Sequence, residues 1–198
     1  MVIPGKPNLE IRLLTDDDVV DLNKFCLACK SLGLENNKDA QAIKLDKMSM
    51  PYGQYFIGYD TDRECIWNLA GIHHLPEIGP NVWRVLFRGA QLPGYAIGAG
   101  KDFLRISYHW RYFLPLQIQY IQAGYPDAKF VVTTNVKNSS AGKSDRLDKK
   151  VMPPLLNRGI VSLYKENFEL FNTKQNVWLI DVECLTQALA QYQLSQQI

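Results

Sequence analysis

The sequence predicts an α+β fold, because two periodicities alternate along it. Short segments switch between apolar and polar residues with a period of two, as strands do, and longer ones repeat their apolar residues at helical spacing. With 198 residues, of which 46% are hydrophobic, the chain can bury a sizeable core. No internal repeat or linker interrupts it, so we expect one domain over 1–198, with its core at about 9–183 and a C-terminal helix over 184–198.

The first predicted elements are a strand and two helices. Residues 9–14 alternate as a strand does, and Thr15 precedes three aspartates, which is typical of a helix start because acids favour the positive end of the helix dipole. Apolar residues then recur at helical spacing, which predicts a helix over about 16–32 that ends at Gly33. A second helix is expected over about 38–49.

Three strands and a glycine-rich stretch come next. The period of two returns over 54–59, a polar turn follows at 60–64, and a further strand is expected over 66–73. Proline and glycine residues then break the chain before another strand over 82–88. The glycine-rich stretch 93–101 leads into the next helix.

That helix carries the apolar residues between Phe103 and Trp110. Proline has no backbone N–H to continue a helix, so we expect Pro115 to end or kink it. The compact apolar run 129–134 predicts a strand at the centre of a sheet.

The last elements are a helix, two strands and the C-terminal helix. A helix is expected over 145–157, broken or restarted at its two adjacent prolines and closed by Gly159. Strands follow over 160–171 and 176–181, joined by a turn at 172–174.

The formal net charge of +2 hides two oppositely charged segments. Residues 10–21 include five acidic residues and one arginine, whereas residues 137–158 include six basic residues and two acidic ones. The basic segment could hold the phosphates of a ligand, or it could be a solvated helix face. The charge of the whole chain does not indicate a nucleic-acid binder, so nucleic acid is an unexpected partner.

Composition excludes several other classes of protein. Four cysteines are too few for a disulfide scaffold, and no run approaches the 18 apolar residues that would predict a membrane-spanning helix. The N-terminus lacks the basic and apolar regions of a signal peptide. We therefore expect a reduced, cytoplasmic protein that does not enter a membrane.

The order of these elements resembles the GNAT family of N-acetyltransferases over about residues 9–183. The resemblance implies a mixed, mostly antiparallel twisted sheet flanked by helices. In that fold the sheet splays between its fourth and fifth strands and admits acyl-coenzyme A. We therefore expect acetyl-coenzyme A (acetyl-CoA) as the co-substrate.

The family motif Q/R-x-x-G-x-G/A is matched by residues 91–96, although Pro93 removes one N–H donor. A later register, at 98–101, supplies glycine backbone and a lysine but lacks the leading Gln or Arg. A glycine-rich helix entry that binds no ligand remains an alternative. The residues that the resemblance implies for the cofactor are Gln91, Leu92, Gly94, Gly98, Ala99, Gly100, Lys101, Asn135 and Asn138.

The resemblance also implies a separate role for each group of these residues. The backbone of Gln91 and Leu92 would stabilise an oxyanion, and 98–100 would hold the pyrophosphate at a helix start. Asn135 or Asn138 would bind the pantetheine arm. The adenosine phosphate would lie against the basic segment, at Lys143, Arg146 and Lys149.

The catalytic candidates are His73 and His74, at the end of the strand expected over 66–73. Neighbouring side chains of a strand point to opposite faces, so one of the two could face a cleft and take a proton from an amine. An ordinary capping or surface histidine is the alternative. The family commonly has a tyrosine as general acid four residues before the glycine that ends its last helix, but here that position is Leu155.

We expect no metal site. Cys26 and Cys29 both lie on the apolar stripe of the first helix, which is typical of buried reduced thiols, and zinc would need two further ligands.

Two functions follow from the resemblance. The first is an acyl-CoA-dependent N-acyltransferase, specifically an N-acetyltransferase, that acts on an unidentified amine of a small molecule or a protein. The alternative is a catalytically degenerate GNAT-like protein that acts as a protein-interaction module.

Overall fold

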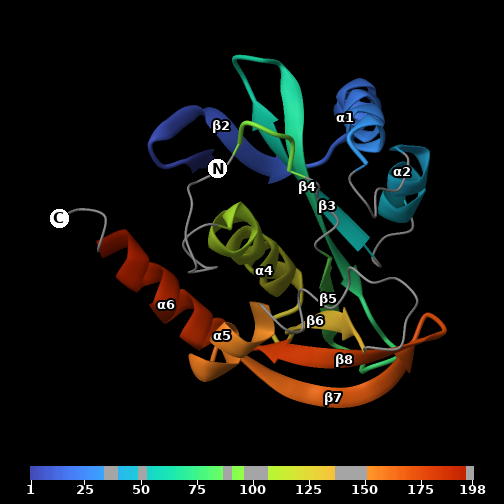
Figure 1. Ribbon diagram of the computed structural model, residues 1–198, viewed down its shortest axis with the longest axis vertical. Coiled ribbons are helices and arrows are strands. Elements are labelled where there is room, and N and C mark those ends of the chain that lie inside the picture. The colour runs from blue at the N-terminus through green and yellow to red at the C-terminus, as the bar shows by residue number, and fades with distance from the viewer. Residues whose placement is uncertain (34–39, 49–52, 87–90, 96–106, 137–150, 195–198) are drawn as a thin grey trace.

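One eight-stranded sheet organises the chain (Figure 1). The computed structural model describes the chain except for residues 34–39, 49–52, 87–90, 96–106, 137–150 and 195–198. The strands follow the spatial order β1-β2-β3-β4-β5-β6-β8-β7. They are β1 (Val2–Ile3), β2 (Lys6–Leu13), β3 (Gly53–Asp60), β4 (Cys65–His74), β5 (Val82–Leu86), β6 (Lys129–Asn135), β7 (Val161–Leu170) and β8 (Thr173–Ile180). All neighbours are antiparallel except β5 and β6, so the predicted mixed, mostly antiparallel sheet is confirmed.

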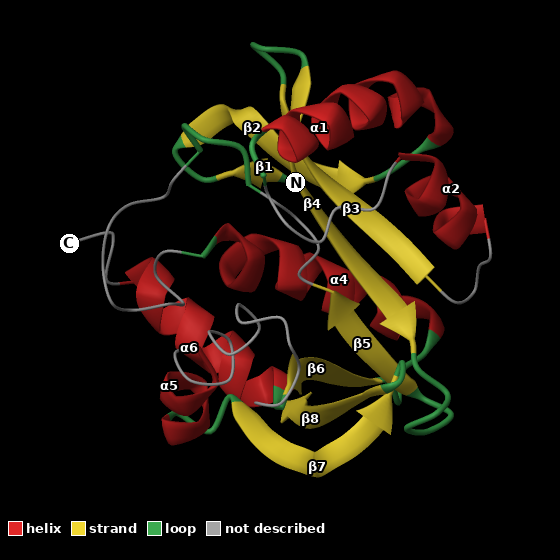
Figure 2. Cartoon of the chain, turned by 45° about the vertical axis from the view of Figure 1, so that its right-hand side comes forward, coloured by secondary structure: helices red, strands yellow, loops and turns green. Residues whose placement is uncertain are grey.

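Helices cover both faces of the sheet (Figure 2). They are η1, a 3-10 helix (Asp16–Asp18), α1 (Val19–Ser31), α2 (Ala40–Met48), η2, a π-helix (His109–Phe113), α4 (Leu114–Gly124), α5 (Met152–Asn157) and α6 (Val182–Leu194). Along β3 the side chains alternate between the faces: Phe56 packs with residues of α4, α5 and α6, whereas Tyr55 and Ile57 pack with α1 and α2. We call these the α4 face and the α1 face.

The two parallel strands pair over three residues and then part. Val82, Trp83 and Arg84 of β5 lie opposite Lys129, Phe130 and Val131 of β6. Beyond these pairs β5 continues to Leu86 and β6 to Asn135, where β6 pairs only with β8. The sheet therefore opens between β5 and β6, as the resemblance predicts.

Pro115 was expected to end or kink its helix, and the structure shows that it does not end it. The chain is helical without a break from the π-helix η2 to the end of α4 at Gly124, and Pro115 lies in the first turn of α4. The amide of Leu114 donates to the carbonyl oxygen of His109, five residues earlier, as in a π-turn. The wider turn immediately before the proline lets the helix continue where a proline would otherwise interrupt an α-helix.

Most other predicted boundaries hold within a few residues. Gly33 and Gly159 have positive φ angles, as expected of glycines that end helices. The turn before β8 comes earlier than expected, because Phe171 and Asn172 take positive φ angles there. The short edge strand β1 was not predicted, since two residues are too few to show a period.

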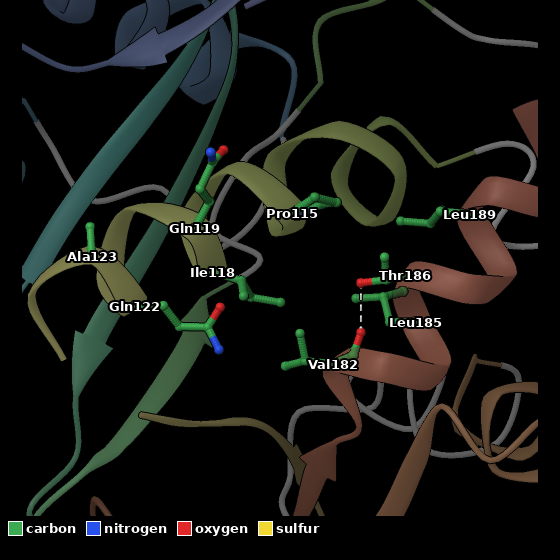
Figure 3. Close-up of a pocket in the computed structure, with 9 residues that line it drawn as sticks. All are labelled: Pro115, Ile118, Gln119, Gln122, Ala123, Val182, Leu185, Thr186 and Leu189. Atoms are coloured by element: carbon green, nitrogen blue, oxygen red, sulfur yellow. Dashed lines mark hydrogen bonds between the residues drawn. The ribbon is translucent and has the colours of Figure 1, made fainter. Parts of the chain in front are cut away.

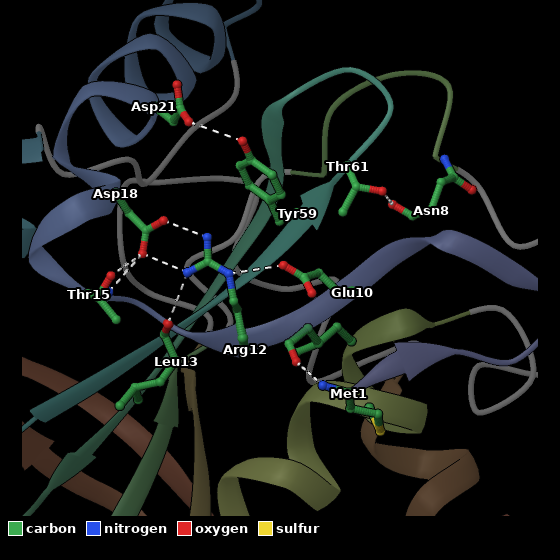
Figure 4. A network of polar contacts seen from close by, with 11 residues as sticks. Met1, Asn8, Glu10, Arg12, Leu13, Thr15, Asp18, Asp21, Tyr59 and Thr61 are labelled. Atoms are coloured by element: carbon green, nitrogen blue, oxygen red, sulfur yellow. Dashed lines mark hydrogen bonds and ion pairs between the residues drawn. The ribbon is translucent and has the colours of Figure 1, made fainter.

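An ion-pair network fixes the junction of β2 and η1 (Figure 4). Arg12 donates two hydrogen bonds to the buried carboxylate of Asp18, at 2.6 and 2.8 Å, and a third to Glu10 at 3.0 Å. Asp18 also accepts bonds from the backbone N–H and the hydroxyl of Thr15. The predicted helix start is thus confirmed, with Asp18 closing a capping box that Thr15 opens.

This network predicts a loss of stability in acid. Burial raises the pKa of Asp18, but the bonds from Arg12 and Thr15 outweigh it, so its pKa lies below the ordinary 3.8. A lowered pKa contributes stability that is fully present above the unfolded value and is lost as the pH falls through the folded value. We expect the urea midpoint to change little from pH 7 to pH 5 and to fall towards pH 3, with a smaller fall in Asp18→Asn. Equal falls in both proteins would contradict this assignment.

A second prediction concerns the contact between β3 and β4. A Cβ added at Gly58 would lie 2.5 Å from the Trp67 side chain, which is fully buried. We expect Gly58→Ala to lower the free energy of unfolding by about 1–3 kcal/mol through overpacking, measured by urea denaturation. Gly124→Ala is the control, since a Cβ there meets nothing within 4 Å. Equal effects of the two substitutions would show that the Trp67 contact is not the cause.

Candidate functional site

The opening between β5 and β6 is the centre of the candidate site. Arg84 and Val131 form the last β5–β6 pair, and His73 of β4 lies opposite Arg84 on its other side. Directly opposed residues of an antiparallel pair share a face and lie about 5 Å apart. His73 and Arg84 therefore lie side by side at the level where the sheet opens.

His73 lies on the α1 face of the sheet. Its ring packs edge-on against Tyr55, with 5.4 Å between ring centroids, and Tyr55 belongs to the cluster under α1 and α2. A Cβ added at Gly53 of β3 would lie 3.1 Å from Nε2 of His73, so the glycine leaves room for the imidazole. The alternation of side chains along the strand could predict that His73 lies on this face. It could not predict that Gly53 leaves space beside the imidazole.

His74 has a structural role instead. Its Nε2 lies 2.6 Å from the carbonyl oxygen of Pro80, and a carbonyl only accepts, so this nitrogen donates the proton. The ring also lies against Trp83, at 5.2 Å between centroids. His74 therefore fastens the β4–β5 turn, which leaves His73 as the candidate base.

Arg84 places a cation in the same region, against the aromatic ring of Phe171. Its guanidinium carbon lies 5.0 Å from the ring centroid of Phe171, which stands at the turn between β7 and β8. Segments far apart in the sequence thus meet here: β4, β5 and the β7–β8 turn.

The start of the glycine-rich stretch is folded against β4. The backbone N–H of Leu92 donates to the carbonyl oxygen of Trp67 at 2.9 Å, and the side chain of Gln91 donates to the carbonyl oxygen of Tyr95 at 2.6 Å. Gly94 has a φ of 95°, which favours glycine. The Leu92 amide, expected to stabilise an oxyanion, already donates to a backbone carbonyl of β4 in this structure.

Tyr95 anchors this stretch in the core. Its ring stacks on Trp67 at 5.3 Å, and its hydroxyl donates to the buried carboxylate of Asp60 at 2.8 Å. Asp60 also accepts a bond from Asn8 and from two backbone N–H groups of the β3–β4 turn. Burial raises the pKa of Asp60, but these bonds outweigh it and hold the pKa below 3.8, whereas burial raises the pKa of Tyr95.

We expect Tyr95→Phe to destabilise the protein. The substitution keeps the ring on Trp67 and removes the donor to Asp60, which costs about 1–3 kcal/mol when it leaves a buried acceptor short of a partner. Urea denaturation measures this loss. The matched control is Tyr164→Phe, on an exposed part of β7, which should change the free energy of unfolding by less than about 0.5 kcal/mol. A Tyr95→Phe protein as stable as this control would contradict the anchoring role.

Asn135 ends β6 beyond the last β5–β6 pair, half-buried and opposite Gln175 of β8. It therefore lies on the strand that borders the opening. The other predicted cofactor residues, and the basic residues expected at the adenosine phosphate, lie outside the described residues: Gly98, Ala99, Gly100, Lys101, Asn138, Lys143, Arg146 and Lys149.

Buried polar groups on the α4 face were missed by the sequence reasoning. The carboxamide of Gln117, the hydroxyl of Tyr108 and the indole N–H of Trp67 are all buried, and none has a hydrogen-bond partner among the residues that the structure describes. Unpartnered buried polar atoms are uncommon in folded proteins, so each of these groups requires an explanation.

Leu155 is fully buried in the core of the α4 face and carries no proton to donate. The position that the family uses for a general acid therefore cannot serve as one here. None of the four cysteines forms a disulfide, and within the described ranges no three His, Cys, Asp or Glu side chains are placed to hold a metal ion. Nor does any helix in those ranges have the length and apolar character needed to cross a membrane.

A separate pocket of about 480 Å³ lies between α4 and α6 (Figure 3). Its wall is mostly apolar and includes Ile118, Leu185 and Leu189, with Gln119 and Gln122 on the side of α4. None of the predicted site residues lines it, so it is distinct from the opening between β5 and β6.

No model of a protein family matches the sequence, and a search of curated proteins finds no match either. Solved structures do match. The chain is similar to ribosomal-protein-S5-alanine acetyltransferase from Vibrio fischeri (TM-score 0.54, 10% identity, 88% of this chain and 92% of that one). It is also similar to FdhC, a nucleotide-linked sugar GNAT (0.52, 11%, 93% and 93%), and to an acetyltransferase of the GNAT family from Staphylococcus aureus Mu50 (0.50, 12%, 87% and 98%). At these identities the likeness establishes the fold.

Proposed function

We propose that this chain, a divergent protein with the GNAT fold, transfers an acetyl group from acetyl-CoA to an amine. The observation that carries the proposal is the parting of β5 and β6 after three residue pairs, with His73 at the same level on the neighbouring strand. An opening between two parallel strands gives an extended cofactor arm a way to reach groups on the other face of the sheet.

In this proposal the strands that border the opening hold the cofactor. Asn135 binds the pantetheine arm from the end of β6, and the glycine-rich stretch, anchored by Tyr95, approaches the phosphates. When bound, acetyl-CoA supplies a thioester, which is an activated acyl group. Of the two backbone amides expected at the oxyanion, Gln91 is the one retained, because Leu92 donates to Trp67.

His73 then acts as the general base on the acceptor. An amine attacks a thioester only when uncharged, so it must lose a proton before or during the attack. His73 lies on the α1 face, where the acceptor would bind, and Arg84 lies beside it. The substrate is an amine of a small molecule or a protein. We propose the cytoplasm as the compartment, since thiols stay reduced there and none of the four cysteines forms a disulfide.

Calorimetry with acetyl-CoA, followed by a thiol-release assay over a panel of amines, tests the proposal. We expect saturable binding below millimolar concentration and release of free CoA that depends on one class of amine. The absence of binding at millimolar acetyl-CoA would refute the proposal. The control ligand is adenosine 3′,5′-bisphosphate, which carries phosphates but no pantetheine arm.

Leu155 favours a second candidate, a GNAT-fold protein that binds partners without catalysis. A buried leucine at the position of the general acid removes one member of the usual proton-transfer pair. This candidate requires a specific protein partner together with no thiol release for any amine in the panel. Acceptor-dependent release that is lost in His73→Asn would exclude it.

A further inference from the structure

Gln117 of α4 is a deeply buried polar side chain that the proposed mechanism does not use. It is 0% exposed, and neither its carboxamide oxygen nor its nitrogen has a hydrogen-bond partner within the described ranges. A buried amide in this state destabilises the free protein, because it has left water without gaining a replacement bond. An apolar residue of similar size at position 117 would make the free protein more stable. The glutamine must therefore be explained by something other than stability.

Ring contacts locate Gln117 along the sheet. Near the start of the helix Phe113 packs on Trp67 of β4, and further along Tyr120 packs on Phe56, which pairs with Ala70 of β4. Gln117 is one helical turn from Phe113 and from Tyr120, so it lies between the levels of Trp67 and Ala70.

That level lies beyond the last β5–β6 pair. Along β4, the partner of Gly71 is Leu86 and the partner of His73 is Arg84, so Trp67 and Ala70 lie further along the sheet than the pair of His73 with Arg84. Among the described residues the pairing of β5 with β6 ends at Arg84, so Gln117 lies on the side of that pair towards which the sheet opens. Gln117 thus lies on the α4 face beside the opening.

Its direction around the helix agrees with this placement. Tyr120 contacts β3 on one side of α4, and Ile118 lines the pocket towards α6 on the other. At 100° per residue, Gln117 points between these two directions, towards the middle of the sheet.

Two further buried polar groups lie one helical turn before Gln117, around Phe113. Trp67 of β4 contacts Phe113 and also Tyr108, the latter at 4.9 Å between ring centroids. The indole N–H of Trp67 and the hydroxyl of Tyr108 are buried and, like Gln117, have no hydrogen-bond partner in the part of the chain that the structure describes.

We infer that the Gln117 carboxamide binds an amide group of the pantetheine arm of CoA; this rests on the proposed function. The pantetheine arm contains two secondary amides, each with one N–H donor and one carbonyl acceptor. A carboxamide complements such a group, since its oxygen accepts from the N–H and its nitrogen donates to the carbonyl. Binding supplies the partners that Gln117 lacks in the free protein.

The test compares Gln117→Met with wild type and with the control Gln119→Met, an exposed glutamine of the same helix. Methionine keeps the length of the side chain and removes both polar atoms. Calorimetry should show that Gln117→Met binds CoA about tenfold more weakly, the effect of roughly one hydrogen bond, while adenosine 3′,5′-bisphosphate binds both proteins equally. The melting temperature of the unliganded variant should rise by roughly 2–4 °C, because an unpartnered amide has been removed.

Each outcome separates this inference from the proposed function. Wild type that binds neither CoA nor acetyl-CoA would overturn the proposed function and, with it, this inference. Wild type that binds CoA no better than Gln117→Met would overturn the inference alone. Equal weakening for CoA and for adenosine 3′,5′-bisphosphate would also overturn it, since the pantetheine arm would not be the group recognised. A Gln117→Met protein that melts below wild type would show that the carboxamide already has a partner in the free protein.

Discussion

We expect His73→Asn to lower kcat for acetyl transfer about a hundredfold or more, the usual contribution of a positioned general base. Asparagine keeps a polar side chain on the α1 face but cannot take a proton at neutral pH. The affinity for acetyl-CoA should stay within about twofold, because His73 lies two strands away from β6 and acts on the acceptor. Initial rates of thiol release and calorimetry measure the two quantities separately.

His74→Asn provides the matched control. His74 holds the turn through Pro80, so its loss should lower the melting temperature and leave kcat within about threefold. A His73→Asn enzyme that keeps wild-type kcat, or equal losses of kcat in both variants, would show that His73 is not the base.

Arg12→Leu should cause the largest loss of stability among the substitutions considered. It leaves the Asp18 carboxylate buried with only Thr15 to bind it, and removal of one partner from a buried ion pair costs about 3–5 kcal/mol. One third of the Arg12 side chain is exposed, so we expect a loss of about 2–3 kcal/mol in the free energy of unfolding. Urea denaturation at pH 7 measures it.

The control for charge alone is Lys24→Leu, which breaks an exposed pair with Asp21 on α1. Exposed ion pairs contribute little, so the free energy of unfolding of this variant should stay close to that of wild type. Asp18 is largely protonated in the unfolded chain at pH 3. The difference in free energy of unfolding between Arg12→Leu and wild type should therefore be smaller at pH 3 than at pH 7. A gap of the same size at both pH values would contradict the role of the Asp18 charge.

Local patterns in the sequence predicted most of the fold. Thr15 and the aspartates after it mark a helix start that needs only neighbouring residues, and Gly33 and Gly159 end helices with the positive φ angles that glycine tolerates. The parting of β5 and β6 was an expectation of the resemblance, because no local pattern reports how far two distant strands pair.

The candidate site was less predictable, since its properties depend on three-dimensional neighbours. The sequence could not separate His73 from His74, because the distinction rests on Pro80 and on the space that Gly53 leaves. The Leu92 amide is used by Trp67, 25 positions away along the chain, which no motif reveals. Gln117 would be taken for a surface residue from its type, and its burial follows from the phase of the helix.

The π-helix has a consequence for which changes of chain length this protein tolerates. A π-turn holds one residue more than an α-turn, so a chain shortened by one residue within 109–113 could wind as an ordinary α-helix. Because a π-turn spans nearly the same angle as an α-turn with one residue more, this shortening would leave the residues on both sides of the turn facing as they do now, with Tyr108 still against Trp67. A single-residue deletion within the regular part of α4 would instead rotate the residues before it by about 100° relative to those after it and turn them away from the sheet. The π-turn is therefore the place in this helix where the chain can lose one residue with the least change in packing.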